Sequence, residues 1–465
     1  MDEREMELQA SETRVVGEGQ ALDVFLEETA QKADFYVEYL ASVNATNEVQ
    51  ATSDICNQKG ILLVKSGSRI DGSVAEKILR HKLTQPLEDQ VELKDQLDGE
   101  RLRNHFHALL KRYPDLATIH AALGFEEQFR DLLFHASVNS RLRQKMTVFQ
   151  DRMPDYFESG IFGGWLGALL CRELGFDKEG VRSAFFAGFV RDLGFLHIDP
   201  KIVFKKGVLL AEEWRAIMGH VVVGNLFLSS LSGTSPTVIR AVMEHHERCD
   251  GTGYPAGKQG DRLSVLGNVI GLVDTLQAIR TKQFVRHGRN MMDARPYLQL
   301  NNSKHSPEVG QAMLRLLQKS GLRMTSHDEQ DIELIAARLQ DRLVAVQKSI
   351  PLLSRLITLA DEHKLSGAGA QSLVHVSVNV VETIRRSGLD REELVDWSRS
   401  VEHQPDAGVL DELNEMELLA NELMWQLKSV YRSCRQFGSE QDSSSRVIDE
   451  IGLLCTSMEE VVGDA

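Results

Sequence analysis

Long apolar runs are missing from this sequence of 465 residues. No uninterrupted apolar stretch approaches the roughly 20 residues that a helix needs to span a bilayer. The first residues, MDEREMELQASETR, also lack the basic segment followed by an apolar one that marks a secretory leader. We therefore expect a cytoplasmic protein that makes no contact with a membrane.

Cysteine is scarce and unpaired in the sequence. The five cysteines lie far apart, and none forms a C-x-x-C pair. This pattern excludes a cysteine zinc site and argues against a disulfide framework, so reduced thiols are expected. The five residues are Cys56, Cys171, Cys249, Cys434 and Cys455.

An excess of positive charge is also absent, because the formal net charge is -15. A chain this acidic has little capacity for a broad phosphate-binding face, and no nucleic-acid partner is expected. The sequence contains no P-loop and no internal repeat.

What remains is a mainly helical pattern in three parts. Residues 1–124 contain a polar segment and then GILLVKSGSRIDGSVAEKILRHKL, which predicts a strand, a turn and a helix capped by Asp71, and so a small α+β domain. Residues 125–322 are successive helices of ordinary length. Residues 323–465 form a helical extension whose longest apolar-periodic stretch is DELNEMELLANELMWQLKSVYRSCRQF. This extension either packs on the central domain or binds a protein partner, and a homodimer stays open.

The motif VMEHHERCDGTGYP at 242–255 carries the strongest chemical signal. Ser235 and Pro236 are typical of a helix start, and the glycines after Cys249 end the helix. His245 and His246 therefore fall in its last turn. Adjacent helical side chains diverge by about 100°, so both histidines serve one site only if that site straddles the helix end, as a metal centre can.

Three further candidate ligands lie on neighbouring helices, and two of them, His220 and Asp274, interrupt an otherwise apolar face. Asp192 lies in SAFFAGFVRDLGF, His220 in AEEWRAIMGHVVVGNLF and Asp274 in VLGNVIGLVDTLQAI. Each is a metal-ligand candidate, and each alone is also compatible with a hydrogen-bonded core residue. Nitrogen and carboxylate ligands without thiolates favour manganese or iron over a structural zinc ion.

The string HHERCDGTGYP, followed by a helix with Asp274, resembles the signature of the HD-GYP family of bacterial cyclic di-GMP phosphodiesterases. The resemblance covers about 125–322 and implies an all-helical domain with a metal centre that activates water against the phosphodiester. It assigns the metal ligands and the catalytic dyad aspartate, Asp192. The implied metal ligands are Asp192, His220, His245, His246 and Asp274. The implied substrate-binding residues are Gly253, Tyr254 and Pro255.

Four positions depart from the family pattern. Arg191 stands where the resemblance implies the dyad histidine, and Ser159 where it implies an earlier histidine. Phe195 replaces a lysine that holds phosphate, and QFV at 283–285 replaces an Arg-Pro-Tyr segment. In the family, the dyad histidine, the dyad aspartate and the last aspartate hold one metal, so that position is the damaged one.

We therefore expect a degenerate HD-GYP protein that holds one metal rather than two and acts by binding cyclic di-GMP or a protein partner. A weak but active phosphodiesterase is the alternative, and a phosphohydrolase with another substrate is a third reading. Lys205 in KIVFKKGVLL is a candidate contact for an anionic ligand, whereas the other interpretation of that run is a solvated loop.

Overall fold

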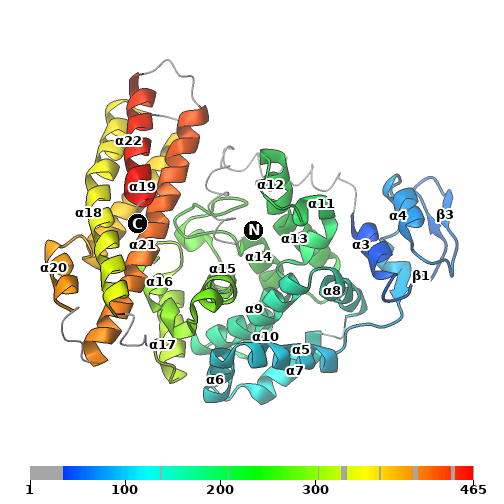
Figure 1. Ribbon diagram of the computed structural model, residues 1–465. Coiled ribbons are helices and arrows are strands. Elements are labelled where there is room, and N and C mark those ends of the chain that lie inside the picture. Colours follow the sequence, from blue (N-terminus) through cyan, green and yellow to red (C-terminus); the bar gives the residue numbers. More distant parts are fainter. Residues whose placement is uncertain are drawn as a thin grey trace. The chain divides into compact units, whose positions relative to one another are not determined.

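The computed structural model describes residues 35–136, 139–207, 209–301, 303–325, 332–365, 368–401, 407–440 and 446–463. Their secondary structure is predominantly helical, which confirms the predicted fold class (Figure 1). The chain divides into two compact units. One contains the described residues up to Gln277 together with Arg315–Gly321, and the other contains Ala278–Leu314 and the described residues from Leu322 onward.

The first unit begins with a small α+β part. Strand β1 pairs antiparallel with β4, and β2 pairs with β3. As predicted, the Asp71 carboxylate accepts hydrogen bonds from the backbone amides of Ser73 and Val74 and so caps the N-terminus of α4. The elements are α3 (Tyr36–Val43), β1 (Val49–Ala51), β2 (Ile55–Cys56), β3 (Leu62–Val64), α4 (Gly72–Leu79), the 3-10 turn η1 (Leu87–Asp89) and β4 (Val91–Leu93).

Helices make up the rest of the first unit. They are α5 (Gly99–Arg112), α6 (Pro114–Ala122), α7 (Glu126–Ala136), α8 (Ser140–Arg152), α9 (Pro154–Glu173), α10 (Lys178–Val190), η2 (Leu193–His197), α11 (Pro200–Val203), α12 (Ala211–Met218), α13 (His220–Ser230), α14 (Pro236–Glu244), η3 (Gly260–Arg262) and α15 (Val265–Ala278). Helix α3 packs on α8 and η2, so the α+β part contacts the helices directly.

Helices α9 and α10 pack unusually closely because glycines remove side chains from their contact. A Cβ at Gly160 would lie 2.5 Å from the carbonyl oxygen of Phe189, and one at Gly164 would lie 2.8 Å from that of Phe185. Gly188 on α10 faces the backbone of Gly163 in the same way. The glycine run therefore allows close helix packing within a continuous α9.

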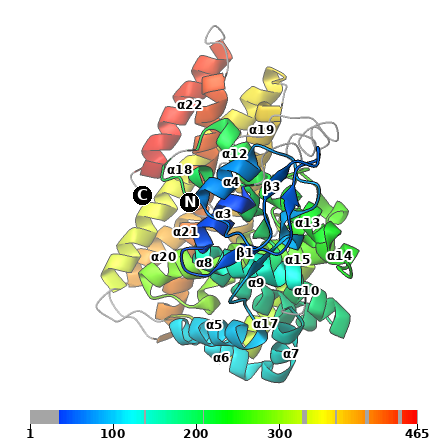
Figure 2. The same ribbon diagram turned by 90° about the vertical axis from the view of Figure 1, so that its right-hand side faces the viewer.

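The second unit contains a bundle formed by four helices, α18 (Ile332–Glu362), α19 (Ala368–Ser387), α21 (Ala407–Glu440) and α22 (Arg446–Gly463), which lie side by side in both views (Figure 1 and Figure 2). Their apolar faces share one core. The remaining elements are η4 (Ile279–Gln283), η5 (Phe284–His287), η6 (Met291–Ala294), α16 (Arg295–Leu300), α17 (Pro307–Lys319), which continues into the first unit, and α20 (Glu392–Val401).

Among the described residues, α18 alone is long and apolar enough to cross a membrane by length and composition. It also packs against three neighbours of the bundle, and its buried side includes Leu339, Leu343 and Leu353. A core helix of a soluble protein passes the same test, so the finding is weak evidence for a membrane span.

The expectation that all cysteines are reduced is wrong for one pair. Cys434 on α21 and Cys455 on α22 form a disulfide, with their Cα atoms 6.1 Å apart. Two consecutive helices of a bundle bring together residues that are 21 positions apart, which sequence spacing alone does not reveal. The other three cysteines are free thiols.

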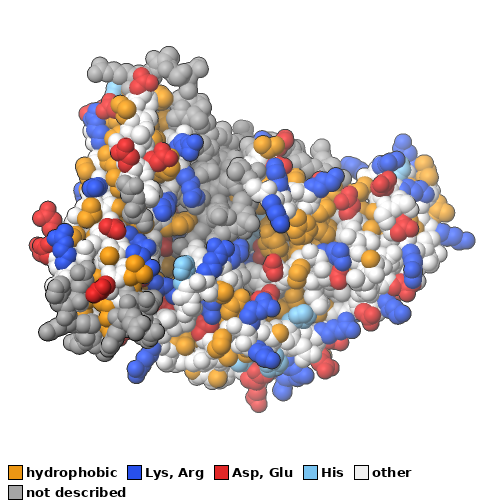
Figure 3. Space-filling model, viewed as in Figure 1, with side chains coloured by type: hydrophobic (Ala, Val, Ile, Leu, Met, Phe, Trp, Pro, Cys, Tyr) orange, Lys and Arg blue, Asp and Glu red, His pale blue; other side chains and the backbone are white. Residues whose placement is uncertain are grey.

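Charged side chains are mixed over the visible surface. On the face drawn in Figure 3, Lys and Arg of the described residues are interspersed with Asp and Glu, and no single basic patch is seen there.

Candidate metal centre

The two adjacent histidines lie at the end of α14, as predicted. The Ser235 hydroxyl accepts a hydrogen bond from the amide of Thr237 at the helix start, and His245 is the C-terminal cap residue. Both imidazoles are buried, with exposed fractions of 0% for His245 and 5% for His246. Their burial sets them apart from solvated helix-end histidines.

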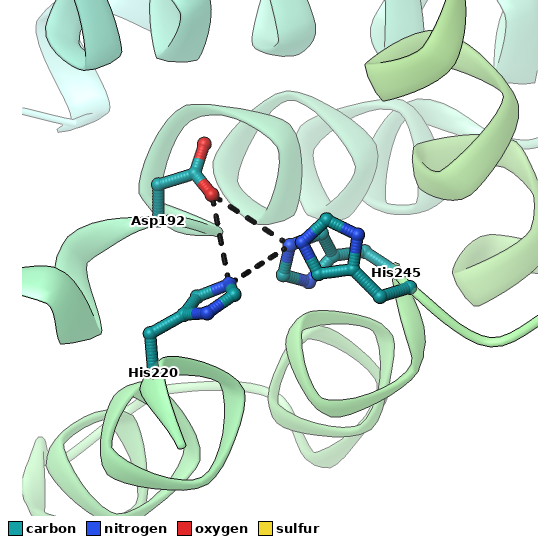
Figure 4. A group of neighbouring side chains, drawn as sticks. Asp192, His220 and His245 are labelled. Carbon is teal, nitrogen blue, oxygen red and sulfur yellow. Dashed lines mark hydrogen bonds and ion pairs between the residues drawn. The ribbon is translucent and has the colours of Figure 1, made fainter. Parts of the chain in front are cut away.

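Two other chain segments bring ligand atoms to the same place. Asp192 follows α10, and His220 is the first residue of α13. One ligand atom from each of Asp192, His220, His245 and His246 lies within 4.8 Å of all the others, and all four side chains are buried. We call these four residues the metal-ligand group. Figure 4 shows the side chains of Asp192, His220 and His245 pointing toward one another.

Backbone carbonyls orient two of the imidazoles. Nδ1 of His220 lies 2.7 Å from the carbonyl oxygen of Ile217, and Nδ1 of His245 lies 2.7 Å from that of Val242. A carbonyl oxygen only accepts, so each Nδ1 carries the proton and donates it. In the neutral rings, each Nε2 therefore presents a lone pair to the centre of the group, which is how metal-binding histidines are held.

The spacing of the ligand atoms fits a divalent ion. The two Nε2 atoms are 3.4 Å apart, and each lies 3.7 Å from Oδ1 of Asp192. Ligand atoms about 2.0–2.2 Å from one ion lie about 3–3.5 Å from each other, so only a small inward movement is required. Without a cation, the lone pairs of His220 and His245 would face each other and a carboxylate. The donor set therefore fits a bound metal ion.

Burial and charge shift the pKa values of His220, His246 and Asp192 toward the protonation states that bind a metal. Burial, helped by the neighbouring His245, lowers the pKa of His220 to about 4, so this imidazole is neutral near pH 7. Burial also lowers the pKa of His246. Burial alone would raise the pKa of Asp192, but the charge of Arg191 and the neighbouring histidines hold it below its usual range.

Arg191 fills the space between two carboxylates beside the metal-ligand group. Its side chain is fully buried. Its Nε donates to Oδ1 of Asp274 at 2.7 Å and lies 3.2 Å from Oδ2 of Asp192. Asp192 therefore directs one oxygen to the arginine and the other to the two imidazoles. The guanidinium forms ion pairs with both acids, and its single positive charge balances one of their two negative charges.

Ser159 and Gly163 complete the surroundings of the guanidinium. Nη1 of Arg191 donates to the carbonyl oxygen of Ser159 at 3.1 Å and to that of Gly188 at 2.8 Å, and Nη2 donates to the Ser159 hydroxyl. A Cβ at Gly163 would overlap Nη1. Ser159 and Arg191, the two positions where the resemblance implies histidines, are thus hydrogen-bonded to each other.

Asp274 is the one predicted ligand outside the four-residue group. It is buried, and its Oδ2 lies 3.7 Å from Nδ1 of His246. Among the described residues, no hydrogen-bond donor reaches this oxygen. Its Oδ1 is occupied by Arg191, so Asp274 is oriented toward the guanidinium.

Aromatic rings cover two of the histidines. Phe195 stacks on His220 with ring centroids 4.1 Å apart, and Tyr254 stacks on His246 at 4.7 Å. Phe195 is buried and carries no charge, so the position where the family holds phosphate with a lysine contributes only packing here. Tyr254 places its GYP segment directly against the metal-ligand group.

Two glutamates that the sequence reasoning did not assign hold the GYP loop in place. Glu247 accepts hydrogen bonds from the amides of Ala256 at 2.6 Å and Lys258 at 2.9 Å. Glu244 is fully buried and accepts from the Lys258 ammonium at 2.5 Å and from the amide of Ser264 at 2.9 Å. In the sequence, the only indication of this role is that Glu244 and Glu247 flank the histidine pair directly.

Gly253 is required by a close backbone approach, because a Cβ there would overlap the carbonyl oxygen of His246 and the amide of Arg248. Pro255 follows in a cis peptide bond with Tyr254.

Lys205, in contrast, pairs with Glu213 at 2.5 Å, and no described contact joins it to the metal-ligand group. The structure thus brings the GYP segment to the group but not Lys205.

Comparison with known proteins agrees with this architecture. Residues 150–309 match the family model described as HD domain. The chain is 26% identical over 243 residues to a cyclic di-GMP phosphodiesterase of Thermotoga maritima, covering 51% of this chain and 62% of that protein. It is 27% identical over 176 residues to the 3'3'-cGAMP-specific phosphodiesterase 1 of Vibrio cholerae, covering 38% of each.

A cyclic di-GMP phosphodiesterase of Pseudomonas aeruginosa is 30% identical over 146 residues, covering 31% of this chain and 35% of that protein. The chain therefore spans less than two thirds of each of these relatives. The matches confirm the resemblance to the HD-GYP family that the motif HHERCDGTGYP indicates.

Proposed function

We propose that this chain, whose residues 150–309 match the HD domain family model, is a catalytically impaired bacterial signalling protein that acts by binding a cyclic dinucleotide or a protein partner rather than by hydrolysis. The observation that carries the proposal is the position of Arg191. Its guanidinium occupies the place between Asp192 and Asp274, the two carboxylates through which the family would hold one of its metals.

The consequence for catalysis follows from the number of metals. A two-metal centre stabilises both the attacking and the leaving oxygen of a phosphodiester, and one bound metal supplies an activated water without that second clamp. Manganese or iron is the metal we propose for the group, with one ion rather than two. Arg191 retains a positive charge at the second position, but a guanidinium does not lower the pKa of a bound water as a metal does.

The residues left in place are suited to ligand binding. The four-residue group is complete, and Tyr254 of the GYP segment packs on His246. The relatives are named for cyclic di-GMP and for 3'3'-cGAMP, and we propose cyclic di-GMP as the ligand to test first. A cytoplasmic location and a protein partner on the α18–α22 bundle belong to the same proposal, and homodimerisation stays open.

The alternative function, a weak cyclic di-GMP phosphodiesterase, is favoured by one observation. All four members of the metal-ligand group remain in position to hold an ion that activates water. Asp192 would then be the carboxylate that contacts the reacting centre.

One experiment separates the two functions. Cyclic di-GMP is incubated at high protein concentration with Mn²⁺ or Fe²⁺, and hydrolysis is followed beside direct binding by equilibrium dialysis. The control is the double variant His245→Ala, His246→Ala. Binding with no turnover above the control would support the proposal, whereas turnover that vanishes in the control would establish the enzyme. Absence of both binding and turnover would refute a cyclic di-GMP function.

A further inference from the structure

A pocket of about 810 Å³ lies in the first unit, away from the metal-ligand group. Its lining includes residues 78–88, which are the end of α4 and the segment after it, and the residues Val223, Leu226 and Phe227 of α13. The volume falls in the range of small-molecule sites, about 300–1,000 Å³. The pocket therefore has room for a ligand of ordinary metabolite size.

One side of this pocket is basic. Arg80, His81 and Lys82 line it consecutively, and all three side chains are exposed. Arg80 has a loose partner in Glu76 at 3.8 Å, with both side chains about three-quarters exposed. Within the described part of the chain, no ion pair is found for Lys82. The cationic groups are thus available to a ligand.

The acidic residue of the lining is already neutralised. Glu88 is the only Asp or Glu among the described lining residues. Its Oε1 lies 2.6 Å from the ammonium of Lys145, which is fully buried behind the pocket. Lys145 also approaches Nε2 of His197, another lining residue, at 2.7 Å. The lining residues therefore carry a net positive charge, which favours binding of an anion.

The part of the lining that α13 contributes is apolar and partly exposed to solvent. Leu226 is 46% exposed, although it belongs to a helix whose other large apolar residues are mostly buried. Val223 and Phe227 of the same helix and Ile78 and Leu83 of segment 78–88 are further apolar residues of the lining. A ligand with an apolar body would cover Leu226 and gain about 25 cal/mol for each Å² removed from water.

We propose that this pocket binds a small amphipathic anion, with an acidic group on the Arg80–Lys82 side and an apolar body on Leu226 and Phe227. Two of the elements that line the pocket also adjoin residues of the metal-ligand group. His197 ends η2, which follows Asp192, and Phe227 lies on α13, which begins at His220. The binding itself is independent of the proposed function.

The test uses 8-anilinonaphthalene-1-sulfonate, a fluorescent aromatic anion, titrated into the full chain. Saturable binding is expected, with the dissociation constant raised at least about tenfold by Leu226→Asp and by Lys82→Glu. Two matched variants outside the pocket, Leu334→Asp and Lys111→Glu, change exposed residues and should leave the affinity unchanged. All four positions are exposed, so folding should be retained, and circular dichroism checks it.

A neutral probe isolates the charge requirement. N-phenyl-1-naphthylamine has the same ring system without the sulfonate, and we expect it to bind at least about tenfold more weakly. The proposal is overturned if the sulfonate probe does not saturate a site, if Leu226→Asp and Lys82→Glu bind it like the control variants, or if the neutral probe binds equally well.

Discussion

Nη1 of Arg191 occupies the space that a side chain at position 163 would need, so Gly163 and Arg191 depend on each other. A Cβ at Gly163 would overlap Nη1 and lie 2.9 Å from the carbonyl oxygen of Gly188. The arginine reaches Ser159 and Asp274 only because α9 has no side chain at this point. The contact between α9 and α10 therefore provides the space that an arginine at position 191 requires.

This dependence predicts that Gly163→Ala destabilises the first unit by about 1–3 kcal/mol, because the added methyl must displace Arg191 or separate two closely packed helices. Urea unfolding followed by circular dichroism measures the loss. Gly452→Ala is the control, since a Cβ there meets nothing within 4 Å on a helix, and it should be neutral or slightly stabilising. Equal effects of the two substitutions would contradict the close contact.

Removing the guanidinium of Arg191 should lower the stability of the fold. Arg191→Met leaves Asp192 and Asp274 buried without their shared cation, and we expect a loss of about 3–5 kcal/mol in unfolding free energy. The measurement is chemical denaturation at pH 7 in the presence of a chelator. Retention of full stability would show that the carboxylates find other partners.

Arg191→His should restore a second metal position. The imidazole would join the Asp192 and Asp274 carboxylates, so Mn²⁺ should recover stability in this variant but not in Arg191→Met. Metal analysis after equilibration with Mn²⁺ should rise from about one ion per chain toward two. A constant stoichiometry in Arg191→His would count against the assignment of this place as the lost metal position.

The two aspartates should respond differently to amide substitution. Asp192→Asn is expected to abolish binding of the single Mn²⁺, because Asp192 faces both His220 and His245. Asp274→Asn should retain most of the Mn²⁺ binding, since Oδ1 of Asp274 accepts a hydrogen bond from Arg191. Thermal unfolding with and without Mn²⁺ reports the difference. Loss of Mn²⁺ binding in both variants would mean that Asp274 is also a ligand.

The Cys434–Cys455 disulfide should stabilise the helical bundle. A bridge that closes a loop of 21 residues contributes about 3 kcal/mol in the chain-entropy account. We expect Cys455→Ser to match the wild-type chain measured with dithiothreitol, and the oxidised wild type to unfold at higher denaturant. Identical curves with and without the reductant would exclude a stabilising role.

Local patterns predicted the ends of elements well, and tertiary neighbours poorly. Ser235 at the start of α14 and Asp71 before α4 were correctly predicted because a cap acts within three residues of its helix end. Of the metal-ligand group, His245 and His246 were found through the HHERCDGTGYP motif at a helix end, and His220 through its polar character on an apolar helical face. The pairing of Arg191 with Gly163 and Ser159 could not be found, because helical periodicity says which residues share a face but not what that face meets.

The guanidinium of Arg191 between Asp192 and Asp274 differs from a metal ion in one further respect. A metal is acquired from the surroundings, and its occupancy depends on supply, on competing ions and on chelators. A cation carried on the main chain is present in every molecule from the time it folds. On the proposed function, metal starvation would therefore leave the Asp192–Asp274 side of this domain unchanged, and only the histidine side would respond to the supply of metal.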